Sequence, residues 1–336
     1  MELISILSSP INSKLTLTMK KLFVTIALAL TLSGCSLFPS NWGKEEGFVW
    51  CNARYLDLTS PAYQIPNTVN PTKDKRFKLA YDGYLYAVLG AIELQKSGKS
   101  EDKHFNLPSY VERYSSVDEN GFQATAFKVF KSSEKLELKE IVVAFRGTDE
   151  IKDWKGHNLS PTPKQYKPAQ KFLIDTANDF KGEKLVVTGY SLGGGLAMNV
   201  LRSVNTSNYI TEAWAFNSSP RTGESIKIDS RLHLISVYGE ILDPTRKALR
   251  KGPKSLGALD ENFSDGYNLI DASSFYLHSR WVLARQMLIF ADMVYFEEAG
   301  RPENYISPPL AILKMAEEPK GCSGKYRAFL ESNGRL

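Results

Sequence analysis

Apolar and polar positions along the chain predict a helix followed by a pair of strands in its first half. Residues 76–95 are rich in Leu, Ala and Tyr and contain no proline, which predicts a helix that ends near Gly98. Residues 121–130 and 136–145 are two β-rich runs on either side of a turn-prone segment. This arrangement predicts an antiparallel hairpin.

The pattern changes in the second half of the chain, where helical and strand-like segments alternate. Continuous apolar strands that alternate with helices are typical of a mostly parallel central sheet covered by helices on both faces. The sequence therefore predicts an α/β fold. The segments are a helix at 166–181, a strand at 185–189, a helix at 193–204, strands at 212–216 and 232–238, and a last helix from about Phe275 to Phe296.

A short apolar run near the start of the chain predicts a signal peptide. Met19-Lys20-Lys21 precedes the apolar run 22–32, which has about half of the roughly 20 residues that a membrane-spanning helix needs. We expect residues 1–34 to be the signal peptide, with residues 1–18 an upstream extension from a misplaced start. Residues 32–35, Leu-Ser-Gly-Cys, resemble the lipobox of bacterial lipoproteins, in which the cysteine is lipidated and becomes the new N-terminus.

Lipidation of Cys35 would fix the protein to a membrane of the cell envelope. Serine at position 36, directly after the cysteine, resembles the signal that sorts lipoproteins to the outer membrane in a Gram-negative organism. Residues 35–75 contain four prolines and little periodicity, which predicts a lipidated tether followed by irregular wrapping. We expect residues 76–300 to form the α/β domain, and residues 301–336 to be a C-terminal tail packed on it.

Composition fits one large domain and gives no sign of a nucleic-acid partner. The chain has 336 residues, 43% of them hydrophobic and 24% charged. Removal of residues 1–34 takes away three lysines and one glutamate, so the formal net charge falls from +5 to +3. With Cys35 assigned to lipid, we expect Cys51 and Cys322 to form a disulfide in an exported protein. The oligomeric state stays open.

Gly189-Tyr190-Ser191-Leu192-Gly193 matches the pattern G-x-S-x-G and lies between a predicted strand and a predicted helix. A sharp turn at this point presents the serine hydroxyl above the sheet, and the small flanking residues allow the backbones to pack closely. Ser191 is therefore the candidate nucleophile. A serine hydroxyl is a weak nucleophile at neutral pH, so it needs a base and an acid, which follow it in the order Ser, Asp or Glu, His.

Four histidines compete for the role of base. His104 and His157 precede the serine and do not fit the chain order. His233 lies inside a strand-like run, where its side chain would face a sheet surface. His278 stands at the start of the last predicted helix, where a loop can bring it over Ser191. We therefore select His278.

Two carboxylates compete for the role of acid. The strand at 232–238 is followed by Gly-Glu-Ile-Leu-Asp-Pro, which contains Glu240 and Asp243. Asp243 is preferred by residue type, because aspartate is the commoner acid, whereas Glu240 is nearer the strand end. The sequence leaves both alternatives open.

The reaction also needs hydrogen-bond donors aimed at the developing oxyanion. One is expected to be the backbone N–H of Leu192. The other is expected from the loop Phe145-Arg146-Gly147-Thr148, in which Thr148 offers both its N–H and its hydroxyl. Arg146 is expected to form a structural ion pair. This chemistry requires no metal and no cofactor.

Three motifs together resemble the class 3 lipase family. They are VVAFRGT (142–148), VVTGYSLGGGLA (186–197) and WAFNSSPRTG (214–223), which are similar to the family's F-R-G-[ST] loop, G-x-S-L-G-G elbow and S-P-R turn and occur in the same order. The resemblance implies an α/β-hydrolase fold, a lipid ester as substrate, and a triad of Ser191, His278 and either Asp243 or Glu240. It also implies an oxyanion hole made by Thr148 and Leu192.

The chain departs from that family at residues 149–167, where such lipases carry an apolar lid and this segment is mostly polar. A phospholipase or a general esterase therefore fits about as well as a triacylglycerol lipase. Two other hypotheses stay open. In the first, the chain is a non-catalytic surface lipoprotein that keeps a hydrolase-like scaffold for binding. In the second, it is a serine hydrolase that acts on amides or thioesters with the same triad.

Overall fold

The computed structural model describes residues 70–92, 104–119, 121–147, 164–220, 222, 229–246, 263–267, 274–302 and 305–313. Its helices and strands are, in chain order, α2 (Lys75–Ile92), β1 (Val111–Glu119), β2 (Phe122–Phe130), β3 (Leu138–Phe145), α4 (Tyr166–Asp179), β4 (Leu185–Tyr190), α5 (Leu192–Arg202), the 3₁₀ helix η5 (Ser207–Tyr209), β5 (Glu212–Phe216), β6 (Leu232–Val237), β7 (Phe263–Tyr267), α7 (Ser274–Leu277), α8 (Arg280–Glu298) and α9 (Pro308–Ile312).

The seven strands form one sheet in the order of the sequence, from β1 to β7. β1, β2 and β3 pair antiparallel, and every pair from β3 to β7 is parallel. Because parallel strands run in the same direction, β3 to β6 all end at the same edge of the sheet. The loops that carry the candidate site residues therefore leave the sheet at this edge.

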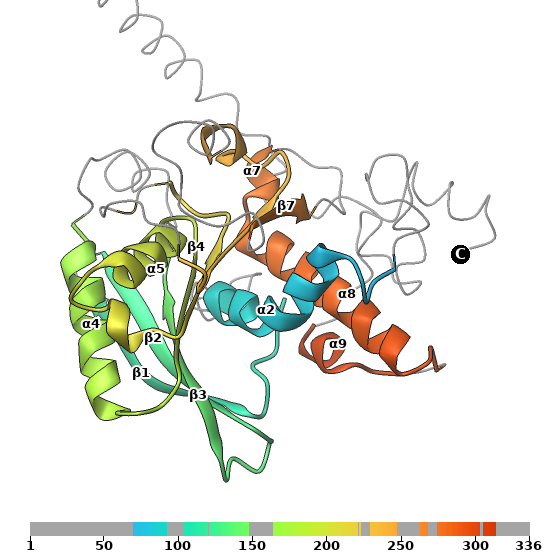
Figure 1. Ribbon diagram of the computed structural model, residues 1–336, viewed down its shortest axis with the longest axis horizontal. Helices are drawn as coiled ribbons and strands as arrows, with labels where there is room; N and C mark the ends of the chain where they lie inside the picture. The colour runs from blue at the N-terminus through green and yellow to red at the C-terminus, as the bar shows by residue number, and fades with distance from the viewer. Residues whose placement is uncertain are drawn as a thin grey trace, which may run out of the picture. The chain divides into compact units, whose positions relative to one another are not determined.

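Helices cover both faces of the sheet, with α4 and α5 on one side and α2 and α8 on the other (Figure 1). All six residues of β4 are buried, as expected for a strand enclosed on both faces. Alternate residues of β3 serve the two layers. Val142 and Ala144 join the core under α2 and α8, whereas Ile141 and Val143 join the core under α4 and α5.

Helix α2 lies close to the sheet at Gly83. A Cβ atom at this position would lie 2.2 Å from Cζ3 of Trp214 in β5, so only glycine allows this approach. The outer side of α2 packs on α8, where the rings of Phe77 and Phe290 are 4.4 Å apart. Both helices are consequently buried over most of their length.

The predicted hairpin, the strands at 185–189, 212–216 and 232–238, and the helices at 166–181 and 193–204 are confirmed, with no boundary more than two residues from its predicted place. The predicted helix at 76–95 is present as α2, and the residues after Ile92 lie outside the described residues up to His104. The last predicted helix is confirmed as α8 from Arg280 onward, but its first part is different. The chain is not one continuous helix from Phe275, since α7 ends at Leu277 and α8 begins at Arg280.

Other predictions fall on parts of the chain that the structure does not describe. They concern the signal peptide and tether, Cys35, Cys51 and Cys322, and most of the C-terminal tail. Within the described ranges, no helix combines the length and the apolar composition that a bilayer crossing requires.

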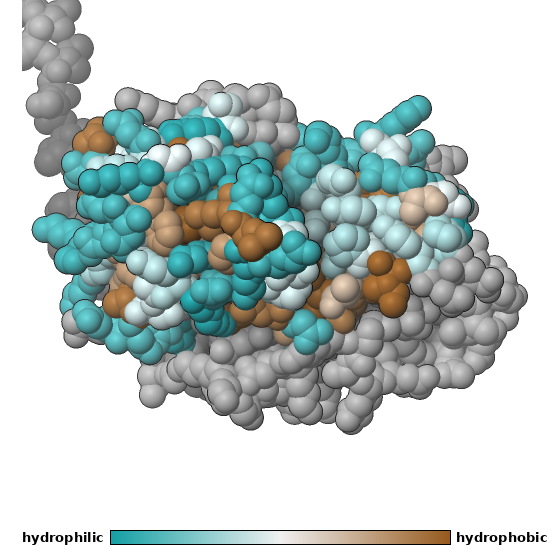
Figure 2. Space-filling view, turned by 90° about the horizontal axis from the view of Figure 1, so that it is seen from below, coloured by the Kyte–Doolittle hydropathy of each residue, from teal (hydrophilic) through white to brown (hydrophobic). Residues whose placement is uncertain are grey.

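Figure 2 shows one face of the molecule, on which hydrophilic residues surround a short strip of apolar ones. Of the described residues, Leu136 and Val204 are the most exposed large apolar side chains, at 85% and 89%. Such exposed apolar residues are common on protein surfaces.

We predict that Gly83→Ala destabilises the protein, because the new methyl group would overlap the ring of Trp214. Overpacking of this kind costs about 1–3 kcal/mol in the free energy of unfolding, measured by urea denaturation. Lys78→Ala, on the exposed side of the same helix, is the control, with an expected change within about 0.5 kcal/mol. Equal stability of Gly83→Ala and the wild type would contradict the close contact between α2 and β5.

Candidate active site

Ser191 occupies a strained turn between β4 and α5. Its backbone has φ 51° and ψ −118°, a conformation that is uncommon for any residue other than glycine. Three hydrogen bonds hold this backbone. The Ser191 N–H donates to the carbonyl of Phe216 at 3.0 Å, and the Ser191 carbonyl accepts from Gly195 at 3.1 Å and Ser219 at 2.8 Å. The turn therefore presents the serine side chain at the carboxyl edge of the sheet.

Small residues allow the chain to pass close to the turn. A Cβ atom at Gly193 would lie 2.2 Å from the carbonyl oxygen of Phe145 at the end of β3. A Cβ atom at Gly147 would lie 2.5 Å from the carbonyl oxygen of Tyr190 and 3.5 Å from Cβ of Ser191. The loop after β3 therefore passes directly beside Ser191.

His278 lies in the interruption between α7 and α8, with its imidazole directed at Ser191. Its Nε2 is 3.1 Å from the Oγ of Ser191, within hydrogen-bonding distance. The interruption places this side chain, because the backbone leaves the helical conformation at Ser279, which has φ −62° and ψ 132°. The imidazole is 17% exposed and is therefore partly open to solvent.

Glu240 follows the end of β6 and contacts the other side of the same imidazole. Its Oε2 is 2.5 Å from Nδ1 of His278 and also accepts the N–H of Leu242 at 3.0 Å. Its Oε1 accepts a hydrogen bond from the guanidinium of Arg246. Glu240 and Arg246 have fully buried side chains, so they form an ion pair that is closed to water.

The geometry selects Glu240 over Asp243 as the carboxylate beside His278. Asp243, the choice by residue type, lies in the turn after β6, where its Oδ2 accepts the N–H of Gly239 at 3.0 Å. The two carboxylates differ in their distance from the end of β6. Glu240 comes three residues after Val237, the last residue of this strand, and reaches His278. Asp243 lies three residues further along the chain, at the start of a helical turn at residues 243–246.

The surroundings of Glu240 favour its ionised form. Burial alone would raise the pKa of this carboxyl, but the hydrogen bond and charge of His278, the charge of Arg246 and the N–H of Leu242 outweigh burial. The pKa of Glu240 is consequently below its ordinary value. A carboxylate that stays ionised can orient the imidazole and stabilise its cation.

One of the two residues expected to bind an oxyanion lies within the described structure. Leu192 is the first residue of α5, so its N–H is one of the helix N-terminal donors that have no partner inside the helix. Thr148 lies outside the described residues, and its neighbour Gly147 lies against Ser191. The contribution of Thr148 stays a prediction.

Two other histidines of the described structure lie in different surroundings. His233 stacks on Trp214 with ring centroids 3.9 Å apart, on a face of the sheet as expected from its place inside a strand. It lines a cavity of about 580 Å³ at the amino ends of the strands, the edge opposite to Ser191. His104 stacks on Trp281, and burial, assisted by the charges of Arg285 and Arg280, lowers its pKa to about 3. His157 lies outside the described residues.

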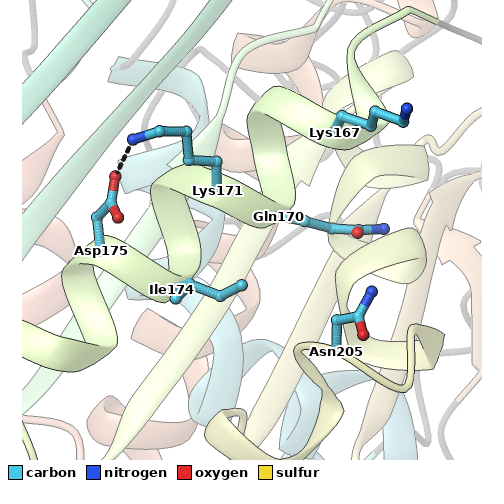
Figure 3. Close-up of a pocket in the computed structure, with 6 residues that line it drawn as sticks. All are labelled: Lys167, Gln170, Lys171, Ile174, Asp175 and Asn205. Carbon is cyan, nitrogen blue, oxygen red and sulfur yellow. Dashed lines mark hydrogen bonds and ion pairs between the residues drawn. The ribbon is translucent and has the colours of Figure 1, made fainter.

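A second cavity, of about 440 Å³, lies at the surface beside α4 (Figure 3). Its side chains come from α4 and from Asn205, and Lys171 and Asp175 form an ion pair at 2.6 Å between successive turns of α4. Ser191, His278 and Glu240 are not among its lining residues. In the part of the chain that the structure describes, no group of three or more His, Cys, Asp or Glu side chains is arranged to hold a metal ion.

The sequence did not indicate two residues that contact the triad. They are Arg246, which pairs with Glu240, and Asn217, which contacts the backbone of His278. Arg246 follows the acid region without a recognisable motif. Asn217 belongs to the segment 214–223, whose resemblance to a lipase turn does not indicate this contact. Its fully buried side chain donates to the carbonyls of Leu277 and His278 at 3.3 and 3.4 Å.

Comparisons with known proteins agree with a lipase-like α/β-hydrolase. Residues 86–230, less than half of the chain, match a family model described as a Tle-like phospholipase domain. The matched part includes Ser191 and Asn217 and ends before Glu240 and His278. The resemblance to lipases that the three motifs indicate is thus confirmed at the level of a phospholipase-like hydrolase domain.

Several solved lipase structures show a distant similarity. The Lip2 lipase of Yarrowia lipolytica is 16% identical, with 48% of this chain and 71% of that chain covered and a TM-score of 0.33. A mono- and diacylglycerol lipase of Aspergillus oryzae is 16% identical, with 56% and 77% covered and a TM-score of 0.30. These scores are too low to assign an activity. No curated protein matched the chain.

We predict that Glu240→Gln destabilises the protein in a pH-dependent way. The folded-state pKa of Glu240 is lowered, so its charge stabilises the protein above the ordinary value of 4.5 and this contribution is lost as the pH falls through the folded pKa. Glutamine leaves Arg246 without a countercharge, at a cost of about 3–5 kcal/mol near neutral pH. The difference in free energy of unfolding between wild type and variant should shrink below about pH 4.5.

The control is Glu137→Gln, which removes a carboxylate from an exposed pair with Lys131. We expect a change of at most about 1 kcal/mol at neutral pH for this variant. A difference for Glu240→Gln that stays constant on acidification would show that Glu240 is not held as a buried anion.

Proposed function

We propose that this lipase-like hydrolase cleaves carboxylic esters of lipids through an acyl-enzyme on Ser191, with His278 as base and Glu240 as the orienting acid. One observation carries the proposal. A single imidazole lies 3.1 Å from the Oγ of Ser191 through Nε2 and 2.5 Å from the Oε2 of Glu240 through Nδ1. This chain of nucleophile, base and acid follows the order Ser, Glu, His along the sequence.

The proposed reaction begins with attack of the Ser191 Oγ on the ester carbonyl carbon, while Nε2 of His278 takes the hydroxyl proton. The carbonyl π electrons move to oxygen, and the N–H of Leu192 stabilises the resulting oxyanion together with a second donor expected from Thr148. The tetrahedral intermediate collapses with cleavage of the C–O ester bond, and His278 gives its proton to the departing alcohol. Water then attacks the acyl-enzyme by the same route and releases the acid and the free serine.

Glu240 supports both proton transfers without exchanging a proton itself. Its hydrogen bond to Nδ1 keeps the unprotonated Nε2 directed at Ser191, and its negative charge stabilises the imidazolium that forms. Arg246 and the N–H of Leu242 hold the carboxylate in place. Because all these partners are fixed before substrate binds, the site needs little rearrangement during the reaction.

A lipid ester is the substrate class that the comparisons favour. The family model is described as phospholipase-like, and the resemblance of residues 142–148 and 186–197 to class 3 lipases points in the same direction. A lipid group on Cys35 would hold the active site near a membrane of the cell envelope, where lipid substrates are concentrated.

We predict that an alkyl fluorophosphonate labels the wild-type protein and that Ser191→Ala abolishes labelling, because the probe reacts with an activated serine. Glu240→Gln should lower kcat for a short-chain ester roughly 10³–10⁴-fold, since glutamine cannot stabilise the imidazolium. Asp243→Asn is the matched control, because an amide oxygen still accepts the N–H of Gly239. It should keep kcat within about tenfold of the wild-type value.

The absence of labelling in a folded wild-type protein would favour a non-catalytic binding module. A larger loss for Asp243→Asn than for Glu240→Gln would assign the acid to Asp243. Hydrolysis of amides or thioesters in preference to esters would keep the triad but overturn the substrate class.

We predict that Cys35→Ala separates membrane anchoring from catalysis. The lipidated wild type should be recovered with membranes and should hydrolyse vesicle phospholipids faster than the variant, while both act equally on a soluble short-chain ester. Mass spectrometry of the mature N-terminus provides the direct check. An unmodified Cys35, or equal rates on vesicles, would contradict the anchor.

A further inference from the structure

We infer that Asn217 is a positioning residue, which holds the backbone that carries His278 in register with Ser191. The inference rests on the proposed function, because it assigns a task within the Ser191, His278 and Glu240 triad. Asn217 itself does not contact the reacting atoms. It follows Phe216, the last residue of β5, and its side chain is fully buried.

The side chain of Asn217 joins two segments that are far apart in the sequence. Its Oδ1 accepts the N–H of Val237, the last residue of β6, at 2.9 Å. Its Nδ2 donates to the carbonyls of Leu277 and His278 at 3.3 and 3.4 Å. One amide group therefore ties the segment that carries the base to the end of the strand that leads to Glu240.

The backbone around Asn217 is bonded to the nucleophile. The carbonyl of Phe216 accepts the N–H of Ser191 at 3.0 Å, and the N–H of Ser219 donates to the carbonyl of Ser191 at 2.8 Å. Residues 216–219 thus contact the backbone of Ser191 on one side and the carbonyl of His278 on the other. This short segment is a direct physical link between nucleophile and base.

The acid is connected to the same segment. The carbonyl of Ser218 accepts a hydrogen bond from Nη1 of Arg246 at 3.1 Å, and the other end of this guanidinium pairs with Glu240. All three members of the triad therefore have a hydrogen-bonded connection to residues 216–219. A shift of this segment would change the distances between all of them.

Asparagine has the backbone and side-chain properties that this position requires. The backbone of Asn217 has φ 41°, a left-handed conformation that asparagine tolerates better than most residues other than glycine. The side chain must accept one hydrogen bond and donate two, and an amide does both. Aspartate keeps the acceptor for Val237 but directs a carboxylate oxygen at two carbonyl oxygens. Glycine keeps the backbone conformation and loses every side-chain hydrogen bond.

A positioning role has a different kinetic consequence from a purely structural one. Displacement of a catalytic group by about 1 Å can cost about 10²-fold in rate, even when the mutated residue does not touch the substrate. Loss of Asn217 should therefore lower kcat with little change in KM. A residue that only stabilises the fold should lower the free energy of unfolding and leave kcat of the folded fraction unchanged.

The experiment compares Asn217→Gly and Asn217→Asp with Asn199→Ala. Asn199 is a buried asparagine in α5 that donates to the carbonyl of Thr222 at 2.7 Å and accepts from Gln170 at 3.0 Å. The variant Asn199→Ala loses similar buried hydrogen bonds, but Asn199 does not contact the triad. Folding of each protein is checked by circular dichroism and urea denaturation.

We predict that both Asn217 variants lower kcat for a soluble ester about tenfold to a hundredfold at nearly constant KM, with a parallel fall in the rate of fluorophosphonate labelling. Asn199→Ala should lose stability and keep kcat. Wild-type kcat in Asn217→Gly or Asn217→Asp, or an equal loss of kcat in Asn199→Ala, would overturn the positioning role.

Proton NMR separates this inference from the proposed activity. The buried hydrogen bond from Nδ1 of His278 to the carboxylate of Glu240 should give a far-downfield proton signal in the wild type and in Asn199→Ala, and Glu240→Gln should remove it. Loss of the signal in both Asn217 variants supports the positioning role even if the wild type hydrolyses no ester, in which case only the proposed function fails. Retention of the signal in these variants overturns the positioning role.

Discussion

The site depends on the close contact between the N-terminal turn of α5 and the end of β3. A side chain at Gly193 would collide with the carbonyl of Phe145, so glycine is required for the helix to start where it does. This contact, together with the hydrogen bonds of Ser191 to Phe216 and Ser219, holds Ser191 in its left-handed conformation. The parallel sheet places all of these partners at one edge, since β3, β4 and β5 end side by side.

A buried carboxylate is the second requirement of this arrangement. An isolated charge in the interior is costly, and its pKa would rise until it became neutral. Glu240 avoids this outcome because Arg246, Leu242 and His278 surround it with donors. The same contacts fix its orientation. Charge compensation and positioning of the imidazole are therefore two consequences of one set of hydrogen bonds.

Much of the fold follows from sequence patterns with a clear physical origin. Strands β3 to β6 are mostly apolar, because each is enclosed by helices on both faces, and this pattern predicts them as strands. Strand β1 was missed because it pairs with only one neighbour and most of its residues are exposed, so its sequence lacks an apolar pattern. Strand β7 lies at the opposite end of the sheet and pairs only with β6, and its sequence Phe-Ser-Asp-Gly-Tyr contains no apolar run that would predict a strand.

The candidate site was predictable where chain order restricted the choice and unpredictable where it did not. Ser191 and His278 follow from the elbow pattern and the order rule. Glu240 and Asp243 are separated by only three residues, so the choice between them depends on how the turn after β6 folds. The helix interruption at His278 and the role of Asn217 depend on contacts between distant segments, and local sequence does not encode such contacts in a recognisable pattern.

The central claim is that Ser191 is a nucleophile activated by His278 and Glu240, and its most direct test is a crystal structure of the protein after reaction with an alkyl phosphonate. We predict phosphorus bonded to the Oγ of Ser191, a phosphonyl oxygen within hydrogen-bonding distance of the N–H of Leu192, and the imidazole of His278 still in contact with Glu240. An unmodified Ser191 in protein exposed to excess reagent, or phosphorus bonded to a different residue, would contradict the claim.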